Sequence, residues 1–278
     1  MRPAAVAAPI VATGAALVAW SGWIEPRRTV VRHRTLSLPN WPAALDGLRV
    51  ALVSDLHAGG PHVGPERVGR VAALVQREAP DLVCLLGDFV DWGVSFARPV
   101  TPEAIAAPLG ALRAPMGVVA VLGNHDYKTD GARVAGALRG VGIAVLENDA
   151  IAVGSAERAL WVAGVEDPSH RMPDIAAAVA RVPDGVPLLV LSHDPDLFPA
   201  VPARAALTLS GHTHGGQVNL PPLRARIIPS LFGDRYARGH VVEDGRHLYV
   251  TSGVGTSTHP VRFARPPEVV VLTLQPTA

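Results

Sequence analysis

The sequence is poor in cysteine and aromatic residues and carries almost no net charge. Cys84 is the single cysteine, so a disulfide framework is excluded, and its place in the apolar run 81–86 favours a core residue. Aromatic residues make up 5% and the formal net charge is +1, so bulk electrostatic binding to nucleic acid is not expected. Apolar residues make up 49% of the 278 positions, which indicates an ordered globular protein.

Charge is also missing from the N-terminus. Residues 4–24 contain no charged side chain and as a helix would span about 32 Å, close to a bilayer core. Arg2 precedes this stretch and four arginines follow it, which favours a cytoplasmic C-terminal domain. The four are Arg27, Arg28, Arg32 and Arg34. We therefore expect residues 1–24 to form a hydrophobic anchor or signal that associates the protein with a membrane, the anchor being favoured.

The alternative is a cleaved signal peptide and a secreted or extracytoplasmic protein, because residues 19–21 match a small-x-small cleavage site. A buried helix ranks third. Residues 25–47 are expected to be a linker and lead-in, since Pro26, Pro39 and Pro42 discourage a long helix. Nothing in the sequence indicates an oligomeric state.

From residue 48 onward, apolar runs alternate with amphipathic stretches. Buried strands are expected at 48–53, 82–86, 118–122, 143–153, 159–165, 188–191, 207–209, 249–251 and 268–274. Helices are expected at 65–77, 102–112, 132–138 and 174–181. This order predicts one α/β domain over 48–276, with two β-sheets packed face to face and flanking helices.

Five short polar motifs each follow an apolar run. They are Ser54-Asp55-Leu56-His57, Gly87-Asp88-Phe89-Val90-Asp91, Gly123-Asn124-His125-Asp126, Ser192-His193-Asp194 and Gly211-His212-Thr213-His214. In open α/β sheets, ligands gather at the carboxyl ends of the strands. We therefore expect the five motifs to form one site.

These motifs carry the side chains of a metal centre. Asp55 and His57 are two residues apart at a strand end and point to the same side, and His212 and His214 repeat this spacing. Asp88 follows a glycine, where the backbone can turn, and its carboxylate can bridge two cations. Mixed nitrogen and oxygen ligands suit Mn, Fe or Zn, so two divalent ions are expected. The expected ligands are Asp55, His57, Asp88, Asn124, His193, His212 and His214.

The ordered motifs resemble those of the calcineurin-like metallophosphoesterases, over residues 45–274. Residues 211–217 and 253–257, followed by Pro267-Glu268, resemble a bacterial membrane-associated branch that commonly carries an N-terminal hydrophobic segment. The resemblance implies a four-layer α/β/β/α fold. It also implies a first metal held by Asp55, His57, Asp88 and His214, and a second held by Asp88, Asn124, His193 and His212.

The resemblance further implies that His125 lies near the leaving group as general acid or electrostatic stabiliser. Asp91 would hydrogen-bond His125 and orient it, with Asp126 as the other candidate. The protein Ser/Thr phosphatases of this family have Arg-Gly after the second Asp of the Gly-Asp motif. This chain has Trp92-Gly93 there, which argues against a protein phosphatase.

The expected reaction is hydrolysis of P–O bonds by attack of a metal-bound hydroxide. The expected substrate is a phosphodiester or pyrophosphate of a small molecule, a lipid or a nucleotide-linked compound, and the apolar N-terminus motivates the lipid. The alternatives are a cyclic nucleotide phosphodiesterase and a non-catalytic scaffold that kept the fold. The irregular stretch 221–236 is either a surface loop or a lid that carries Arg224, Arg226 or Arg235 towards substrate.

Overall fold

The computed structural model describes residues 12–93, 95–220 and 227–277. The first eleven residues of the expected anchor, and the lid arginines Arg224 and Arg226, lie outside the described residues.

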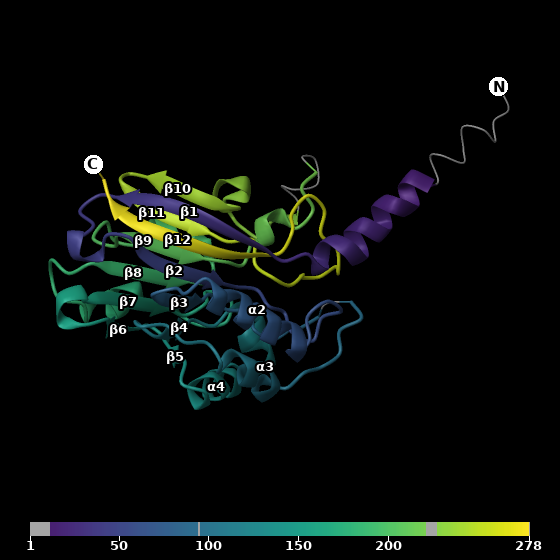
Figure 1. Ribbon diagram of the computed structural model, residues 1–278, viewed down its shortest axis with the longest axis horizontal. Coiled ribbons are helices and arrows are strands. Elements are labelled where there is room, and N and C mark those ends of the chain that lie inside the picture. The colour runs from purple at the N-terminus through teal and green to yellow at the C-terminus, as the bar shows by residue number, and fades with distance from the viewer. Residues whose placement is uncertain (1–11, 94, 221–226, 278) are drawn as a thin grey trace, which may run out of the picture.

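The described strands form two six-stranded sheets (Figure 1). The first has the order β1 (Val30–Leu38), β12 (Glu268–Pro276), β2 (Leu48–Val53), β3 (Leu82–Leu85), β4 (Val118–Ala120) and β5 (Ala144–Val145). The second has the order β10 (Gly239–Glu243), β11 (Arg246–Val250), β9 (Leu207–Ser210), β8 (Leu188–Ser192), β7 (Leu160–Val165) and β6 (Asp149–Val153). Strands β2, β3 and β4 run parallel, as do β7, β8, β9 and β11. Their carboxyl ends therefore share one edge of each sheet.

The core lies between the two sheets, and β3 shows how the sequence builds it. Successive strand side chains point to opposite faces, so Leu82 and Cys84 join the cluster between the sheets. Val83 and Leu85 join the cluster under the helices instead. The strand is consequently apolar at every position, and Cys84 is a buried core residue as expected.

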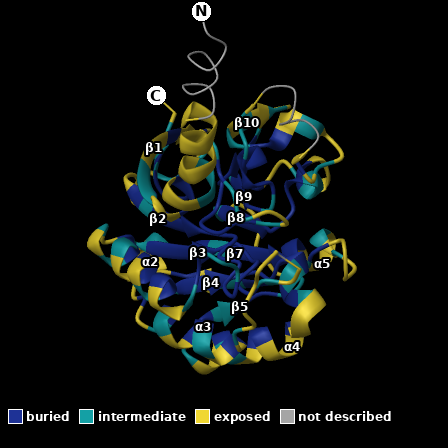
Figure 2. Ribbon diagram, turned by 90° about the vertical axis from the view of Figure 1, so that its right-hand side faces the viewer, coloured by how far each residue is buried: buried dark blue, intermediate teal, exposed yellow. Residues whose placement is uncertain are grey.

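Helices cover the outer faces of both sheets. Those on the first sheet are α2 (Pro65–Arg77), α3 (Pro102–Leu109) and α4 (Asn124–Gly140). The short helix α5 (Ile175–Ala180) packs on the second sheet, so α2 and α3 lie on one side of the molecule and α5 on the other (Figure 2). The expected α/β fold of two facing sheets with flanking helices is confirmed.

Several boundaries differ from those expected. The segment 25–47 is more than a linker, because β1 pairs in parallel with β12 at the edge of the first sheet. Because an edge strand tolerates polar side chains, β1 contains Arg32 and Arg34, and its sequence does not show the apolar run by which a buried strand is predicted. The apolar run 143–153 breaks into β5 and β6, which belong to different sheets. Helix α4 begins at Asn124 rather than at 132, and β10 was not expected.

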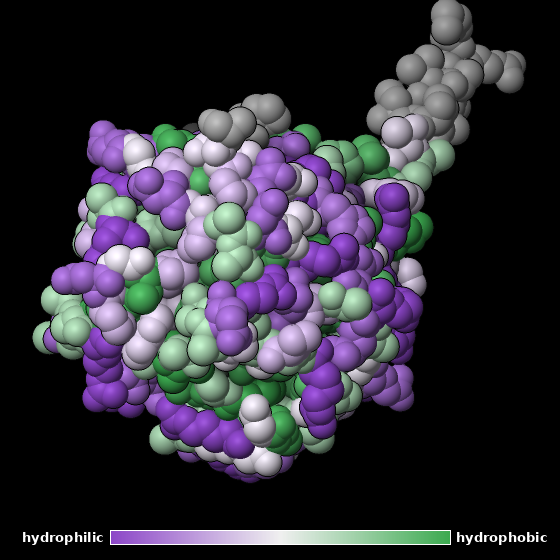
Figure 3. All heavy atoms as spheres, turned by 60° about the vertical axis from the view of Figure 1, so that its left-hand side comes forward, coloured by the Kyte–Doolittle hydropathy of each residue, from purple (hydrophilic) through white to green (hydrophobic). Residues whose placement is uncertain are grey.

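An exposed helix precedes the folded body. Residues 12–19 are α-helical and continue into a π-helical turn, Trp20–Ile24. This helix projects from the body (Figures 1 and 3), whose surface mixes hydrophilic and hydrophobic residues on the face that Figure 3 shows. Within the described residues, no helix combines the length and the apolar character needed to cross a membrane.

Candidate metal centre

The five polar motifs converge where strands from both sheets end. They follow β2, β3 and β4 of the first sheet and β8 and β9 of the second. Five of the expected ligands adopt the left-handed backbone region, which non-glycine residues seldom enter and which is concentrated at functional sites. These are Asp55 (φ 53°), His57 (φ 44°), Asp88 (φ 55°), His212 (φ 68°) and His214 (φ 51°). Tight turns thus aim the side chains inward directly after the strands.

Two glycines let these turns approach one another. Gly87 has a φ of 90°, and a Cβ there would lie 2.6 Å from the backbone nitrogen of Gly123 and 2.8 Å from His193 Nδ1. A Cβ on Gly211 would lie 2.6 Å from an Asp55 carboxylate oxygen. Larger residues at either position would push the ligand-bearing loops apart.

The first group of ligands surrounds Asp55, which is fully buried. His214 Nε2 lies 3.5 Å from Asp55 Oδ1 and 3.0 Å from His57 Nε2. The second group surrounds His193, whose Nε2 lies 3.2 Å from His212 Nδ1. Buried ring nitrogens this close to one another fit a shared cation better than they fit direct contact.

Asp88 lies between the two groups. Its Oδ2 is 3.4 Å from His57 Nε2 and 3.3 Å from His193 Nε2. Burial would raise the pKa of Asp88, but His193 and His57 hold it well below its usual range, so the side chain is a carboxylate. Burial, reinforced by the charges of His57 and Arg262, lowers the pKa of His214, so this ring is neutral. Both forms are the ones that bind a metal.

The remaining donors also fit cations. Asn124 is buried, and its Oδ1 has no hydrogen-bond partner among the described residues, as expected of a ligand oxygen. The Nδ1–H of His193 donates to the Leu86 carbonyl at 2.6 Å, which leaves Nε2 free to bind. Two subsets of the expected ligands have ligand atoms within 4.8 Å of one another, Asp55 with His57 and His214, and Asp88 with His193 and His212; a third group joins His57 and Asp88 to His125.

His125 lies beside the ligands, but Asp91 does not face it. Asp91 Oδ1 is 3.7 Å from His57 Nδ1, so this carboxylate lies behind a ligand. His125 Nδ1 instead accepts from the backbone N–H of Trp92 at 3.2 Å, and its ring meets that of His57 edge-on at 4.6 Å. Burial lowers the pKa of His125 to about 4, so the ring is neutral and carries its proton on Nε2. The hydrogen bond to His125 Nδ1 thus comes from the backbone of Trp92, and a role of Asp91 in orienting His125 stays a prediction.

Asp126, the other candidate for orienting His125, binds backbone groups. Its buried carboxylate accepts from the backbone N–H groups of Asp88, Phe89, Val90 and Gly123. It therefore ties the second motif to the third, a role that neither its residue type nor its position reveals.

Arg262, which follows the glycine-rich stretch 253–255, also lies at the site, behind His214. It is fully buried, and its Nη2 lies 3.3 Å from His214 Nδ1 and 2.6 Å from the carbonyl of Gly255, to which it donates. Gly255 in turn donates its backbone N–H to the Asp55 carbonyl. Arg262 contacts the backbone carbonyl of Gly255, seven residues earlier in the chain, and a contact of this kind produces no periodic pattern in the sequence.

A pocket of about 340 Å³ opens beside His214. Val218, Ile227 and Val261 contribute apolar walls, and Ser257 and His259 contribute polar groups. Arg235, which the lid alternative would direct towards substrate, pairs with Glu243 at 2.6 Å.

Comparisons with known proteins agree with this geometry. Residues 48–216 match the family model of the calcineurin-like phosphoesterases. The chain is 29% identical to an uncharacterized metallophosphoesterase, YkuE, of Bacillus subtilis, over 93% of this chain and 90% of that protein. It is 33% identical to a zebrafish (Danio rerio) transmembrane protein with a metallophosphoesterase domain, over 84% of this chain but only 54% of that protein.

A third relative has an assigned substrate in its name. It is the UDP-2,3-diacylglucosamine pyrophosphatase LpxG of Chlamydia trachomatis, 27% identical over 91% of both chains. The family match spans more than half of the chain and contains all five ligand motifs, the last of which, residues 211–214, lies close to its end. The chain therefore belongs to the calcineurin-like phosphoesterase family, and it is a hydrolase that acts on ester bonds.

Proposed function

We propose that this enzyme uses two divalent ions, drawn from Mn, Fe and Zn, to hydrolyse a P–O bond of a phosphodiester or pyrophosphate. The observation that carries the proposal is the position of Asp88 Oδ2, nearly equidistant from His57 Nε2 and His193 Nε2. A carboxylate so placed suits a bridge between two cations, and the orphaned Asn124 Oδ1 suits the second of them.

When bound, such ions would supply a water of lowered pKa and positive charge to stabilise the transition state. The chain's own residues supply the rest. His125 carries a proton on Nε2, because Nδ1 accepts from Trp92, and can donate a hydrogen bond from it to the departing oxygen. The strained loops fix the ligands before substrate arrives, which limits reorganisation during the reaction.

A lipid-linked or nucleotide-linked pyrophosphate is the substrate class that we propose. The LpxG relative is named for such a compound, and the pocket beside His214 offers apolar walls within reach of the centre. The exposed apolar helix before Glu25 would hold the enzyme at a membrane where a lipid substrate resides.

The test is metal reconstitution of the purified full chain. Metal is removed with a chelator, Mn, Zn or Fe is restored singly, and turnover of a UDP-linked lipid is compared with that of cyclic AMP and p-nitrophenyl phosphate. We expect metal-dependent turnover, with the lipid pyrophosphate preferred. Preference for cyclic AMP would overturn the substrate class.

Asp88→Asn tests the bridge. Loss of more than about 100-fold in kcat/KM is expected, since even changes behind the ligands cost 10–100-fold. His33→Ala, at an exposed histidine on β1 that pairs with Glu78, is the matched control and should retain activity. Wild-type activity in Asp88→Asn would rule out a centre bridged by this carboxylate.

A further inference from the structure

A pocket of about 300 Å³ lies between α2 and the segment that follows the N-terminal helix, and arginine dominates its lining. Four arginines line it, and we call it the arginine pocket: Arg27, Arg67, Arg70 and Arg77. Among the described residues that line it, none is acidic and none is an expected metal ligand. In a chain whose net charge is only +1, this is a strong local excess of positive charge.

Arg67 is the most unusual member, because only 5% of it is exposed. Its guanidinium donates to the His62 carbonyl and to Thr29 Oγ1, both at 3.0 Å, and it forms no ion pair with any acid in the described part of the chain. Burial and the charges of Arg70 and Arg27 lower the pKa of Arg67 to about 10. A buried cation without a counter-ion is costly, and a bound anion would offset that cost.

Helix geometry gathers the other charges around it. Positions 67, 70 and 77 of α2 are spaced by three and seven residues, so their side chains share one helix face. Glu66 lies 3.9 Å from Arg70, but both side chains are largely in solvent, where such a pair is weak. The cluster is therefore poorly neutralised from within the chain.

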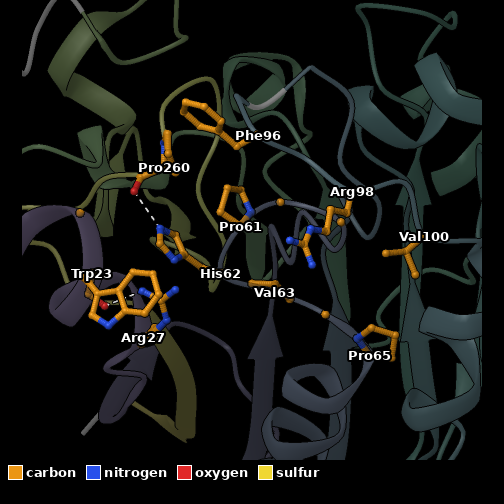
Figure 4. Close-up of a pocket in the computed structure, with 14 residues that line it drawn as sticks. Trp23, Arg27, Pro61, His62, Val63, Pro65, Phe96, Arg98, Val100 and Pro260 are labelled. Carbon is orange, nitrogen blue, oxygen red and sulfur yellow. Dashed lines mark hydrogen bonds between the residues drawn. The ribbon is translucent and has the colours of Figure 1, made fainter.

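A larger, more apolar pocket of about 630 Å³ adjoins the first and shares Arg27 and His62 with it (Figure 4). Trp23, Phe96 and Val100 give it apolar walls, with the Arg27 guanidinium stacked 3.5 Å from the centre of the Trp23 ring. His62 donates Nε2–H to the Pro260 carbonyl, while its buried Nδ1 has no partner among the described residues. Together the two pockets offer positive charge on one side and apolar surface on the other.

Their position relative to the N-terminal helix indicates what occupies them. Leu17, Val18, Trp23 and Ile24 expose 49%, 71%, 66% and 45% of their surface at the end of the helix that leads into Arg27. If this apolar helix enters a bilayer, the arginine pocket lies at the depth of the lipid headgroups. Arginines at that depth bind anionic lipids.

We propose that the arginine pocket binds the headgroup phosphate of an anionic phospholipid, whose apolar part contacts Trp23 and the adjoining pocket. This site is separate from the metal centre and does not depend on the reaction proposed there. Free phosphate would satisfy the same charges, but it would leave the exposed Trp23 and Phe96 without a role. The lipid accounts for both.

Binding of the full chain to vesicles tests the proposal. Affinity is measured for vesicles of phosphatidylcholine alone and for vesicles that also contain phosphatidylglycerol, so that the ratio isolates the effect of negative charge. The N-terminal helix contributes to both affinities and cancels. An arginine near an anionic surface contributes about five-fold. Arg70→Gln should therefore lower the ratio by about five-fold, and Arg27→Gln with Arg70→Gln by up to about twenty-five-fold.

The matched control is Arg158→Gln with Arg181→Gln, which removes the same charge at positions that line neither pocket and should leave the ratio unchanged. An equal fall in the control would mean that net charge, not this pocket, attracts the lipid. An unchanged ratio in the Arg27 and Arg70 variants would overturn the proposal. So would inorganic phosphate at physiological concentration abolishing the preference, because the site would then hold the free anion.

Discussion

At the scale of the residue, the group beside the second ring nitrogen of a candidate ligand histidine affects how that histidine can bind a metal. His193 has the Leu86 carbonyl behind it, and His57 has Asp91. Such partners fix the tautomer and orientation of a ligand and raise its basicity. We therefore propose that Asp91 positions His57 as a metal ligand.

Asp91→Ala should weaken metal binding by about 10–100-fold, because His57 Nδ1 loses its neighbouring carboxylate. Metal affinity is measured by competition with a coloured chelator, and Asp184→Ala, at a fully exposed carboxylate, is the control. The interpretation from sequence, in which Asp91 holds His125, predicts the reverse: normal metal affinity with an altered pH profile of kcat.

The candidate ligands could be identified from the sequence, because each stands in a short motif at the end of an apolar run. Their partners could not. Asp91 and Asp126 are both acids next to motif residues, and only the loop conformations decide that one faces His57 while the other binds four backbone N–H groups. Backbone contacts such as Trp92 N–H to His125 leave no trace in residue type.

At the scale of the element, central strands were predictable and edge strands were not. Strand β2 is buried on both faces, so five of its six residues are apolar and its range matches the expected 48–53. Strand β1 has one neighbour and places Arg32 and Arg34 among its residues. Its attachment depends on Glu268, at the start of β12, whose carboxylate pairs with Arg32 at 2.5 Å and Arg238 at 2.6 Å.

Glu268→Gln should lower the free energy of unfolding at neutral pH by about 2–4 kcal/mol, since Glu268 is buried and its charge is paired. Burial raises the pKa of Glu268, but Arg238 and the Ser252 N–H lower it further, so the folded pKa lies below the ordinary 4.5. A depressed carboxyl pKa stabilises the fold above the unfolded value and loses that contribution as pH falls through the folded one.

Wild type should accordingly lose stability faster than Glu268→Gln as the pH drops below about 4.5. Urea unfolding at a series of pH values measures this difference. Glu66→Gln, at an exposed acid, should follow the wild-type curve. If the free energies of unfolding of wild type and Glu268→Gln fall in parallel as the pH drops, the arginines do not lower the pKa of Glu268.

At the scale of the whole molecule, the segment before β2 belongs to the fold. Buried Glu25 accepts from the backbone N–H groups of Ala264 and Arg265 at 3.0 and 2.5 Å, close to where Arg262 approaches His214. The carbonyl of Ser21 accepts from the backbone N–H of Arg262. The N-terminal helix is thus joined to the loop that lies under the metal centre.

Two truncations test this connection. A chain of residues 25–278 keeps Glu25 and all of β1, and should melt within a few degrees of the full chain. A chain of residues 35–278 loses Glu25 and the part of β1 that pairs with 268–272. At about 1 kcal/mol for each lost hydrogen bond and 2–4 °C for each kcal/mol, its Tm should fall by about 10 °C or more. Calorimetry of both metal-free chains decides the matter without reference to activity. Equal Tm values for the two chains would mean that residues 25–34 are only a linker. The expected difference in Tm would mean that the domain begins before β1.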